Sequence, residues 1–182
     1  MAVKRDYASL LSNGNVKAFL ALIKYTEGAG YQTLFGGEKF TSFDDHPRRP
    51  ITKKLGGKPI TSTAAGAYQF LSRTWDECAT ACGLDDFSPL SQDVAALYLI
   101  DRRRALDAVI EGDWKTALER CNREWASLPG SPYGQPTKTL ETCLSFLYAN
   151  TAKEEAAAPA PFTQPKQEKP SWFRSLLLLF RR

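Results

Sequence analysis

The sequence has one histidine, four cysteines and no CxxC pair. These shortages argue against a metal site, because zinc and similar ions need several histidine or cysteine ligands at set spacings. We therefore expect neither a metal nor a cofactor. The cysteines lie on apolar stripes with tryptophan, leucine and alanine, which predicts core thiols of a reduced protein. They are Cys78, Cys82, Cys121 and Cys143.

The sequence also lacks a long apolar run. Its first 19 residues contain no run of the length found in a signal peptide. We therefore expect a protein that is made in the cytoplasm and stays in that cell or leaves it by another route. The apolar segment at 171–182 is also short, because about 20 apolar residues are needed to span a bilayer.

The composition fits one folded domain. The chain has 182 residues, of which 43% are apolar and 12% aromatic, enough for a real core. The net charge is +4, and residues 166–182 hold five basic side chains against one acidic. The tail therefore carries the whole excess and the rest is neutral. This distribution argues against a nucleic-acid partner, and we expect a monomer.

The first predicted helix has one apolar face, followed by Glu27 on the same stripe. That face consists of Val16, Phe19, Leu20 and Ile23. Gly28 follows and is a natural helix terminator. Burial and the negative end of the helix dipole both raise the pKa of a carboxyl in this position. Glu27 is therefore a candidate general acid near neutral pH. The alternative is a helix-end glutamate that turns out into water.

Other elements are predicted from local composition. Residues 1–14 read as a loose lead-in. From 28 to 66, glycine, proline and threonine are frequent, which predicts a small irregular β lobe. Extended pieces are expected there at 31–35, 38–43 and 50–54, with a turn at Gly56-Gly57. Helices are then expected at 72–82, from Ser88-Pro89 through Ile100, from Asp113, and at 140–148.

The last part of the chain differs from the domain at 15–150. Residues 151–170 are rich in alanine and proline, which predicts a disordered, semi-extended linker. Residues 171–182 form an amphipathic helix when drawn at helical spacing. We expect this helix to lie on an anionic membrane surface; docking on its own domain or on a partner is the alternative. The predicted membrane contacts are Trp172, Phe173, Arg174, Leu176, Leu177, Phe180, Arg181 and Arg182.

Five stretches carry a family resemblance in their order and spacing. Over residues 16–150 the chain resembles the bacteriophage lambda lysozyme family, endolysins that act as lytic transglycosylases. The stretches are AFLALIKYTEG (18–28), GYQTLFGGEKFTSFDDHPR (30–48), STAAGAYQFLSRTWD (62–76), LDDFSPLSQDVAAL (84–97) and WASLPGSPYGQ (125–135).

The resemblance implies an α+β, mainly helical lysozyme-like fold of two lobes with a saccharide cleft between them. It places the family's catalytic glutamate on Glu27, the residue that the helix pattern had already selected. It also implies that two segments line the cleft. The substrate-binding candidates in them are Ser62, Gly66, Tyr68, Gln69, Tyr133 and Gln135.

Several of these residues have a structural alternative. Tyr68 and Gln69 are expected to hydrogen-bond the sugar, or else to brace the junction of the lobes. Tyr133 offers a ring for stacking on a sugar face. Gly66 allows a close approach of the backbone or a turn. Among other residues, we expect core positions for Trp75 and Trp125, and a loop-fixing hydrogen bond from His46.

One departure from the family pattern bears on the reaction. Members can carry an aspartate where this chain has Gln32. A hydrolase normally uses two carboxyl groups, whereas a transglycosylase needs only one. We therefore expect cleavage of the MurNAc–GlcNAc bond in peptidoglycan, with a 1,6-anhydro product. The alternatives are a hydrolytic muramidase, with a second carboxylate among Glu38, Asp44 and Asp45, and a non-catalytic wall-binding or virion-associated protein. By family analogy, a holin pore would release the enzyme to the cell wall.

Overall fold

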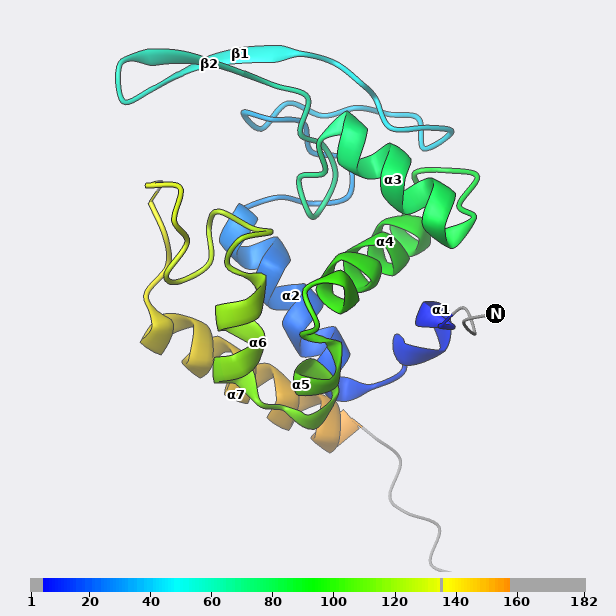
Figure 1. Ribbon diagram of the computed structural model, residues 1–182, viewed down its shortest axis with the longest axis vertical. Helices are drawn as coiled ribbons and strands as arrows, with labels where there is room; N and C mark the ends of the chain where they lie inside the picture. Colours follow the sequence, from blue (N-terminus) through cyan, green and yellow to red (C-terminus); the bar gives the residue numbers. More distant parts are fainter. Residues whose placement is uncertain (1–4, 135, 158–182) are drawn as a thin grey trace, which may run out of the picture.

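The computed structural model describes residues 5–134 and 136–157 (Figure 1). Its architecture is the predicted one, mainly helical with a small two-stranded sheet. The elements are α1 (Tyr7–Leu10), α2 (Gly14–Glu27), β1 (Ile51–Leu55), β2 (Lys58–Ser62), α3 (Ser72–Cys82), α4 (Pro89–Arg102), α5 (Leu106–Glu111), α6 (Trp114–Cys121) and α7 (Leu140–Ala157).

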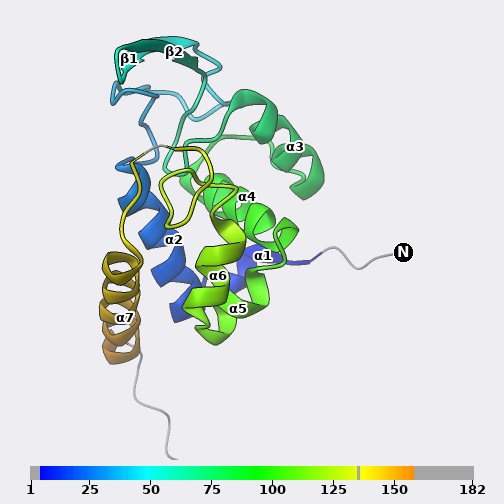
Figure 2. The same ribbon diagram turned by 60° about the vertical axis from the view of Figure 1, so that its left-hand side comes forward.

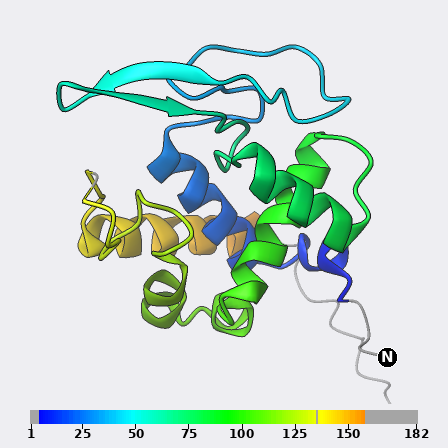
Figure 3. The same cartoon turned by 45° about the horizontal axis from the view of Figure 1, so that its top comes forward.

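The elements form two lobes, with α2 running from one towards the other. The hairpin β1–β2 and the loops around it form a layer over the ends of the helices (Figures 1 and 3). Helix α2 packs against α5 and α7, and α7 lies along its outer side (Figure 2). This arrangement carries the last turn of α2 to the junction between the lobes.

Helix α2 ends at the residue that the sequence indicates, and its first turn is capped by a side chain. The Asn13 side chain accepts a hydrogen bond from the Val16 backbone N–H at 3.0 Å and caps its first turn. Gly28 ends it in the left-handed conformation, with φ of 61°. The predicted apolar face is buried, and Glu27 is the last helical residue.

The β lobe is a hairpin joined by a two-glycine turn. Gly56 and Gly57 both have positive φ, at 56° and 79°, as a type I′ turn requires. The strands pair antiparallel, with Ile51 opposite Ser62. The strand expected at 50–54 is therefore confirmed within one residue. The pieces expected at 31–35 and 38–43 form no strand among the described residues and contribute only isolated bridges, Thr33 to Lys39 and Leu34 to Ala65.

Buried Gln92 on α4 ties the returning loop to the helical lobe. Its Oε1 accepts a hydrogen bond from the Ala67 backbone N–H at 2.9 Å. Its Nε2 donates to the carbonyls of Phe87, at 2.8 Å, and Tyr31, at 3.0 Å. Gly66 precedes Ala67 with φ of 80°. One side chain therefore fixes three chain segments beside the end of α2.

Three parts of the secondary structure were not predicted correctly. Residues 7–10, expected in a loose lead-in, form α1, which docks on α4 through a hydrogen bond from Tyr7 Oη to Asp101 at 2.9 Å. Helix α5 was not expected. Helix α7 continues to Ala157, seven residues into the predicted linker, where Lys17 pairs with Glu154 at 2.9 Å. Alanine and glutamate favour helix, and no proline interrupts them before position 159.

The thiols at 78, 121 and 143 are buried as predicted, whereas Cys82 is only partly buried. None of the described helices combines the length and apolar character needed to cross a bilayer. The predicted contacts at 172–182 lie outside the described residues.

Gly66→Ala should destabilise the fold more than Gly57→Ala. The two glycines have nearly the same φ, 80° and 79°, so the backbone strain of an alanine is matched. A Cβ on Gly66 would lie 2.3 Å from Gln92 Oε1 and 2.9 Å from a Phe87 ring carbon, whereas one on Gly57 meets nothing within 4 Å. Overpacking of this kind costs roughly 1–3 kcal/mol.

Urea unfolding of both variants measures this difference. Equal losses of unfolding free energy in the two variants would contradict the steric argument.

Candidate active site

A cleft of about 470 Å³ lies between the loop that follows β2 and the loop that joins α6 to α7. Five of the seven predicted site residues line it. They are Glu27, Ser62, Tyr68, Gln69 and Tyr133. Gly66 does not line it and instead forms the turn against Gln92, and Gln135 lies outside the described residues.

Glu27 is half-buried at the end of α2 and is held by one hydroxyl. Ser127 Oγ donates a hydrogen bond to Glu27 Oε1 at 2.6 Å. Burial raises the pKa of Glu27 above its ordinary value of 4.5, and the bond from Ser127 partly opposes this rise. A carboxyl of this kind retains its proton closer to neutral pH than an exposed glutamate, which suits a general acid.

The serine belongs to a chain of hydroxyls. Ser127 Oγ also lies 3.0 Å from Thr26 Oγ1, and Thr26 Oγ1 donates to the Ile23 carbonyl at 3.0 Å. Ser127 was not among the residues predicted for the site, although it lies in the stretch WASLPG. The only local signal was a polar residue in a Gly/Pro-rich loop that also holds two buried residues, Trp125 and Leu128.

Tyr68 braces the lobe junction through its hydroxyl. The side chain is only 1% exposed, and its Oη donates to Asp93 Oδ1 at 2.5 Å. Tyr31 Oη donates to the same carboxylate at 2.9 Å and accepts a hydrogen bond from Lys24 at 3.0 Å. Burial raises the pKa of Tyr68 well above its ordinary value. Of its two expected roles, the geometry therefore favours bracing, because the hydroxyl is already bonded.

Gln69 and Tyr133 are also anchored by the protein. Gln69 has φ of 50°, and its Nε2 donates to the Gly66 carbonyl at 2.9 Å and the Thr33 carbonyl at 3.2 Å. Tyr133 is 57% exposed, and its Oη donates to the Arg123 carbonyl at 2.9 Å. Its ring is thereby fixed at the edge of the cleft with much of its surface open.

Glu124 is the second carboxyl that lines the cleft, and it is neutralised by two arginines. Its Oε1 accepts from Arg102 Nη2 at 3.0 Å, and its Oε2 accepts from Arg103 Nε at 2.7 Å. Only 9% of its side chain is exposed. Both of its carboxylate oxygens are therefore already occupied by charge-assisted hydrogen bonds from arginine side chains.

The three acidic residues of the β lobe do not line the cleft. Glu38 pairs with Lys53 at 3.5 Å, and Asp45 pairs with Arg48 at 3.0 Å. Asp44 is exposed. The candidates for a second catalytic carboxylate named from the sequence are thus turned to other partners or to solvent.

His46 fixes a loop, as predicted. The side chain is 2% exposed, its Nδ1 accepts from the Arg48 backbone N–H at 3.0 Å, and its Nε2 lies 2.9 Å from the Phe70 carbonyl. Nε2 is therefore the protonated nitrogen of a neutral ring, and burial lowers its pKa. Trp75 and Trp125 are core residues as expected, and the Trp125 indole also borders the cleft.

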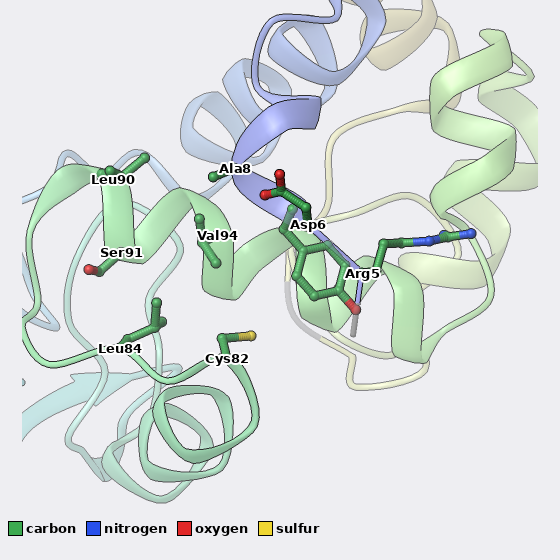
Figure 4. A pocket seen from close by; sticks show the side chains of 9 residues that line it. Arg5, Asp6, Ala8, Cys82, Leu84, Leu90, Ser91 and Val94 are labelled. Atoms are coloured by element: carbon green, nitrogen blue, oxygen red, sulfur yellow. The ribbon is translucent and has the colours of Figure 1, made fainter. Parts of the chain in front are cut away.

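A second cavity, of about 410 Å³, lies beside α1, away from Glu27. Figure 4 shows Cys82 and Leu84, from the end of α3 and the loop after it, beside Val94 of α4 and the α1 segment. None of the predicted site residues lines this cavity.

Comparisons with known proteins identify a family that fits this cleft. A family model for endolysins matches residues 17–153. The chain belongs to the endolysin family. It is 46% identical over 133 residues to the endolysin of Escherichia phage lambda, covering 68% of this chain and 82% of that protein. It is 40% identical over 144 residues to the endolysin of Escherichia phage P2, covering 70% and 87%.

The fold also matches that of solved lysozyme structures. A solved structure of bacteriophage lambda lysozyme complexed with a chitohexasaccharide superposes with a TM-score of 0.71 at 39% identity, covering 76% of this chain and 94% of that one. A second structure of the same lysozyme gives a TM-score of 0.66. The protein is thus an endolysin with a lysozyme fold, a peptidoglycan-cleaving enzyme that acts on the cell wall.

Glu27→Gln should raise stability at neutral pH. Because the pKa of Glu27 is higher in the folded state than in the unfolded chain, its contribution to stability is complete below pH 4.5 and is lost as the pH rises through the folded pKa. Glutamine stays neutral throughout and keeps an oxygen that can accept from Ser127.

Thermal unfolding at pH 4 and pH 7 tests this expectation. The variant should have the higher unfolding temperature at pH 7, and the difference should shrink at pH 4. Glu119→Gln, on the exposed side of α6, is the matched control. A pH-independent difference, or the same gain in the control, would refute the assignment.

Proposed function

We propose that this endolysin is a lytic transglycosylase that cleaves the β-1,4 bond between N-acetylmuramic acid and N-acetylglucosamine. The observation that supports this most directly is the number of usable carboxyl groups in the cleft. Glu27 is half-buried with a raised pKa, whereas Glu124 is held by Arg102 and Arg103. One carboxyl is sufficient for intramolecular cleavage, whereas hydrolysis normally uses two.

In the proposed reaction Glu27 acts first as an acid and then as a base. It gives its proton to the glycosidic oxygen, and the bond from that oxygen to C1 of the muramic residue breaks. The C6 hydroxyl of the same residue then attacks C1 and gives its proton to Glu27. The product is a 1,6-anhydro ring, Glu27 regains its proton, and no water is consumed.

The same cleft supplies the proposed substrate contacts. The solved lambda lysozyme was complexed with a chitohexasaccharide, and by analogy we expect glycan strands in this cleft. The exposed ring of Tyr133 is suited to stacking on a sugar face. Gln69 uses its amide nitrogen on the protein, so we expect its amide oxygen to accept from a sugar hydroxyl or amide.

Delivery to the wall is part of the proposal. We expect the protein to be released from the cytoplasm through a holin-type pore. We also propose that residues 171–182 bind an anionic membrane surface, because apolar and cationic side chains separate on the two faces of a helix in that sequence.

Mass spectrometry of muropeptides released from purified peptidoglycan tests the reaction. Products lighter by one water than the hydrolysed species are expected, and Glu27→Gln should lower the rate by about 10²–10⁴-fold. Glu119→Gln should retain the activity of the unmodified protein.

Products with a free reducing end would instead indicate the muramidase alternative. No products from any form would favour the wall-binding alternative.

Deletion of residues 166–182 tests the role of the tail. The truncated protein should cleave purified peptidoglycan at the original rate but lose binding to liposomes that contain anionic lipid. Replacement of Arg174, Arg181 and Arg182 by glutamine should weaken binding in the same assay, because each basic residue near such a surface contributes about 1 kcal/mol. Equal liposome binding by the truncated and full-length proteins would disprove the idea.

A further inference from the structure

The hydroxyl chain at Glu27 permits two arrangements of protons. Thr26 Oγ1 lies 3.0 Å from the Ile23 carbonyl oxygen, which can only accept, so the Thr26 proton is committed there. Thr26 can then only accept from Ser127 Oγ, 3.0 Å away. Ser127 has one proton and two acceptors within reach, Thr26 Oγ1 and Glu27 Oε1. Its hydroxyl can donate to only one of these two oxygens at a time.

In the first arrangement Ser127 donates to Glu27 Oε1. That oxygen then carries no proton, so the acid proton of Glu27 sits on Oε2. In the second arrangement Glu27 carries its proton on Oε1 and donates it to Ser127, which donates to Thr26, which donates to Ile23. The second arrangement points the acid proton into the protein, and it exists only while Glu27 is neutral.

We propose that Ser127 is a positioning residue that directs the acid proton of Glu27 to Oε2, with Thr26 as the competing acceptor. The inference rests on the proposed role of Glu27 as acid and base. As Oε2 gives up its proton to the glycosidic oxygen, negative charge develops on the carboxylate and the bond from Ser127 becomes charge-assisted. The first arrangement is therefore favoured as the reaction proceeds.

The loop holds Ser127 firmly enough for this role. Its carbonyl accepts from the Lys138 backbone N–H at 3.2 Å. The neighbouring Leu128 is fully buried, and the Trp125 indole donates to the Tyr68 carbonyl at 3.2 Å. The serine hydroxyl is thus carried to α2 from a loop that is anchored on both sides.

Other charged or titratable groups near Glu27 have partners or lie at the edge of the cleft. Those that line it are Tyr68, Tyr133, Arg123 and Glu124. Tyr68 and Glu124 are bonded to Asp93 and to two arginines, and Lys24, one turn earlier on α2, is bonded to Tyr31. Burial and the Ser127 bond are the influences that shift the pKa of Glu27.

The test is the pH dependence of kcat/KM on purified peptidoglycan, measured for variants with opposite expected shifts. Activity requires protonated Glu27, so kcat/KM falls as the pH rises through the pKa of Glu27. This fall is the alkaline limb of the pH profile. Ser127→Ala removes the donor that stabilises the carboxylate, so this limb should move to higher pH. The maximum rate should fall about 10- to 100-fold, the worth of a hydrogen bond to a charged group. Ser127→Thr keeps the hydroxyl, so its alkaline limb should lie at the same pH as in the unmodified protein.

Thr26→Val keeps the shape of the side chain but removes the competing acceptor. The second arrangement, which stabilises neutral Glu27, is then lost, and the limb should move to lower pH. Ser131→Ala is the matched control in the same loop, because the buried Ser131 Oγ has no hydrogen-bond partner among the described residues. Its limb should not move, and thermal unfolding of each variant checks that it is folded.

A fall in rate for Ser127→Ala without movement of the limb would overturn the inference, as would shifts of Ser127→Ala and Thr26→Val in the same direction. Either result leaves the proposed function intact if the unmodified protein releases anhydro products and Glu27→Gln does not. An inactive unmodified protein would instead contradict the proposed function itself.

Discussion

The polar junction between α2, α4 and the loop after β2 is the constraint on which the rest of the structure depends. Gln92 and Asp93 are adjacent on α4, and together they hold that loop and two tyrosines against the end of α2. Buried polar groups are costly unless bonded, so this network is stable in one arrangement only. The two lobes therefore meet at a fixed position, and a cleft exists where they do.

The junction also explains the chemistry available at Glu27. The carboxyl is placed where burial opposes ionisation, yet Ser127 offers a hydrogen bond that favours the charged form. These opposing influences suit a group that must give up a proton and take it back. A fully buried glutamate without a donor would remain neutral, and an exposed one would already be ionised near neutral pH.

Local signals predicted much of this fold. The apolar spacing and terminal glycine of α2, the cap at Ser88-Pro89 and the Gly56-Gly57 turn all act within a few residues, so the chain alone specifies them. The same logic failed for α1, which is four residues long and depends on Asp101 of α4. It also failed at the end of α7, which continues to Ala157, and there Glu154 pairs with Lys17 of α2.

The sequence by itself determined helices α2, α3, α4 and α6, the start of α7, the turn and the candidate acid, because periodicity, caps and glycine conformations are local properties. Only the tertiary structure decided which carboxyls share the cleft. Glu124, from a distant part of the chain, lines it and is paired, while Glu38 and Asp45 are paired elsewhere. It also brought Ser127 to Glu27, 100 positions apart. Such contacts depend on the paths that the loops take across the junction between the lobes. Local sequence patterns do not encode these paths.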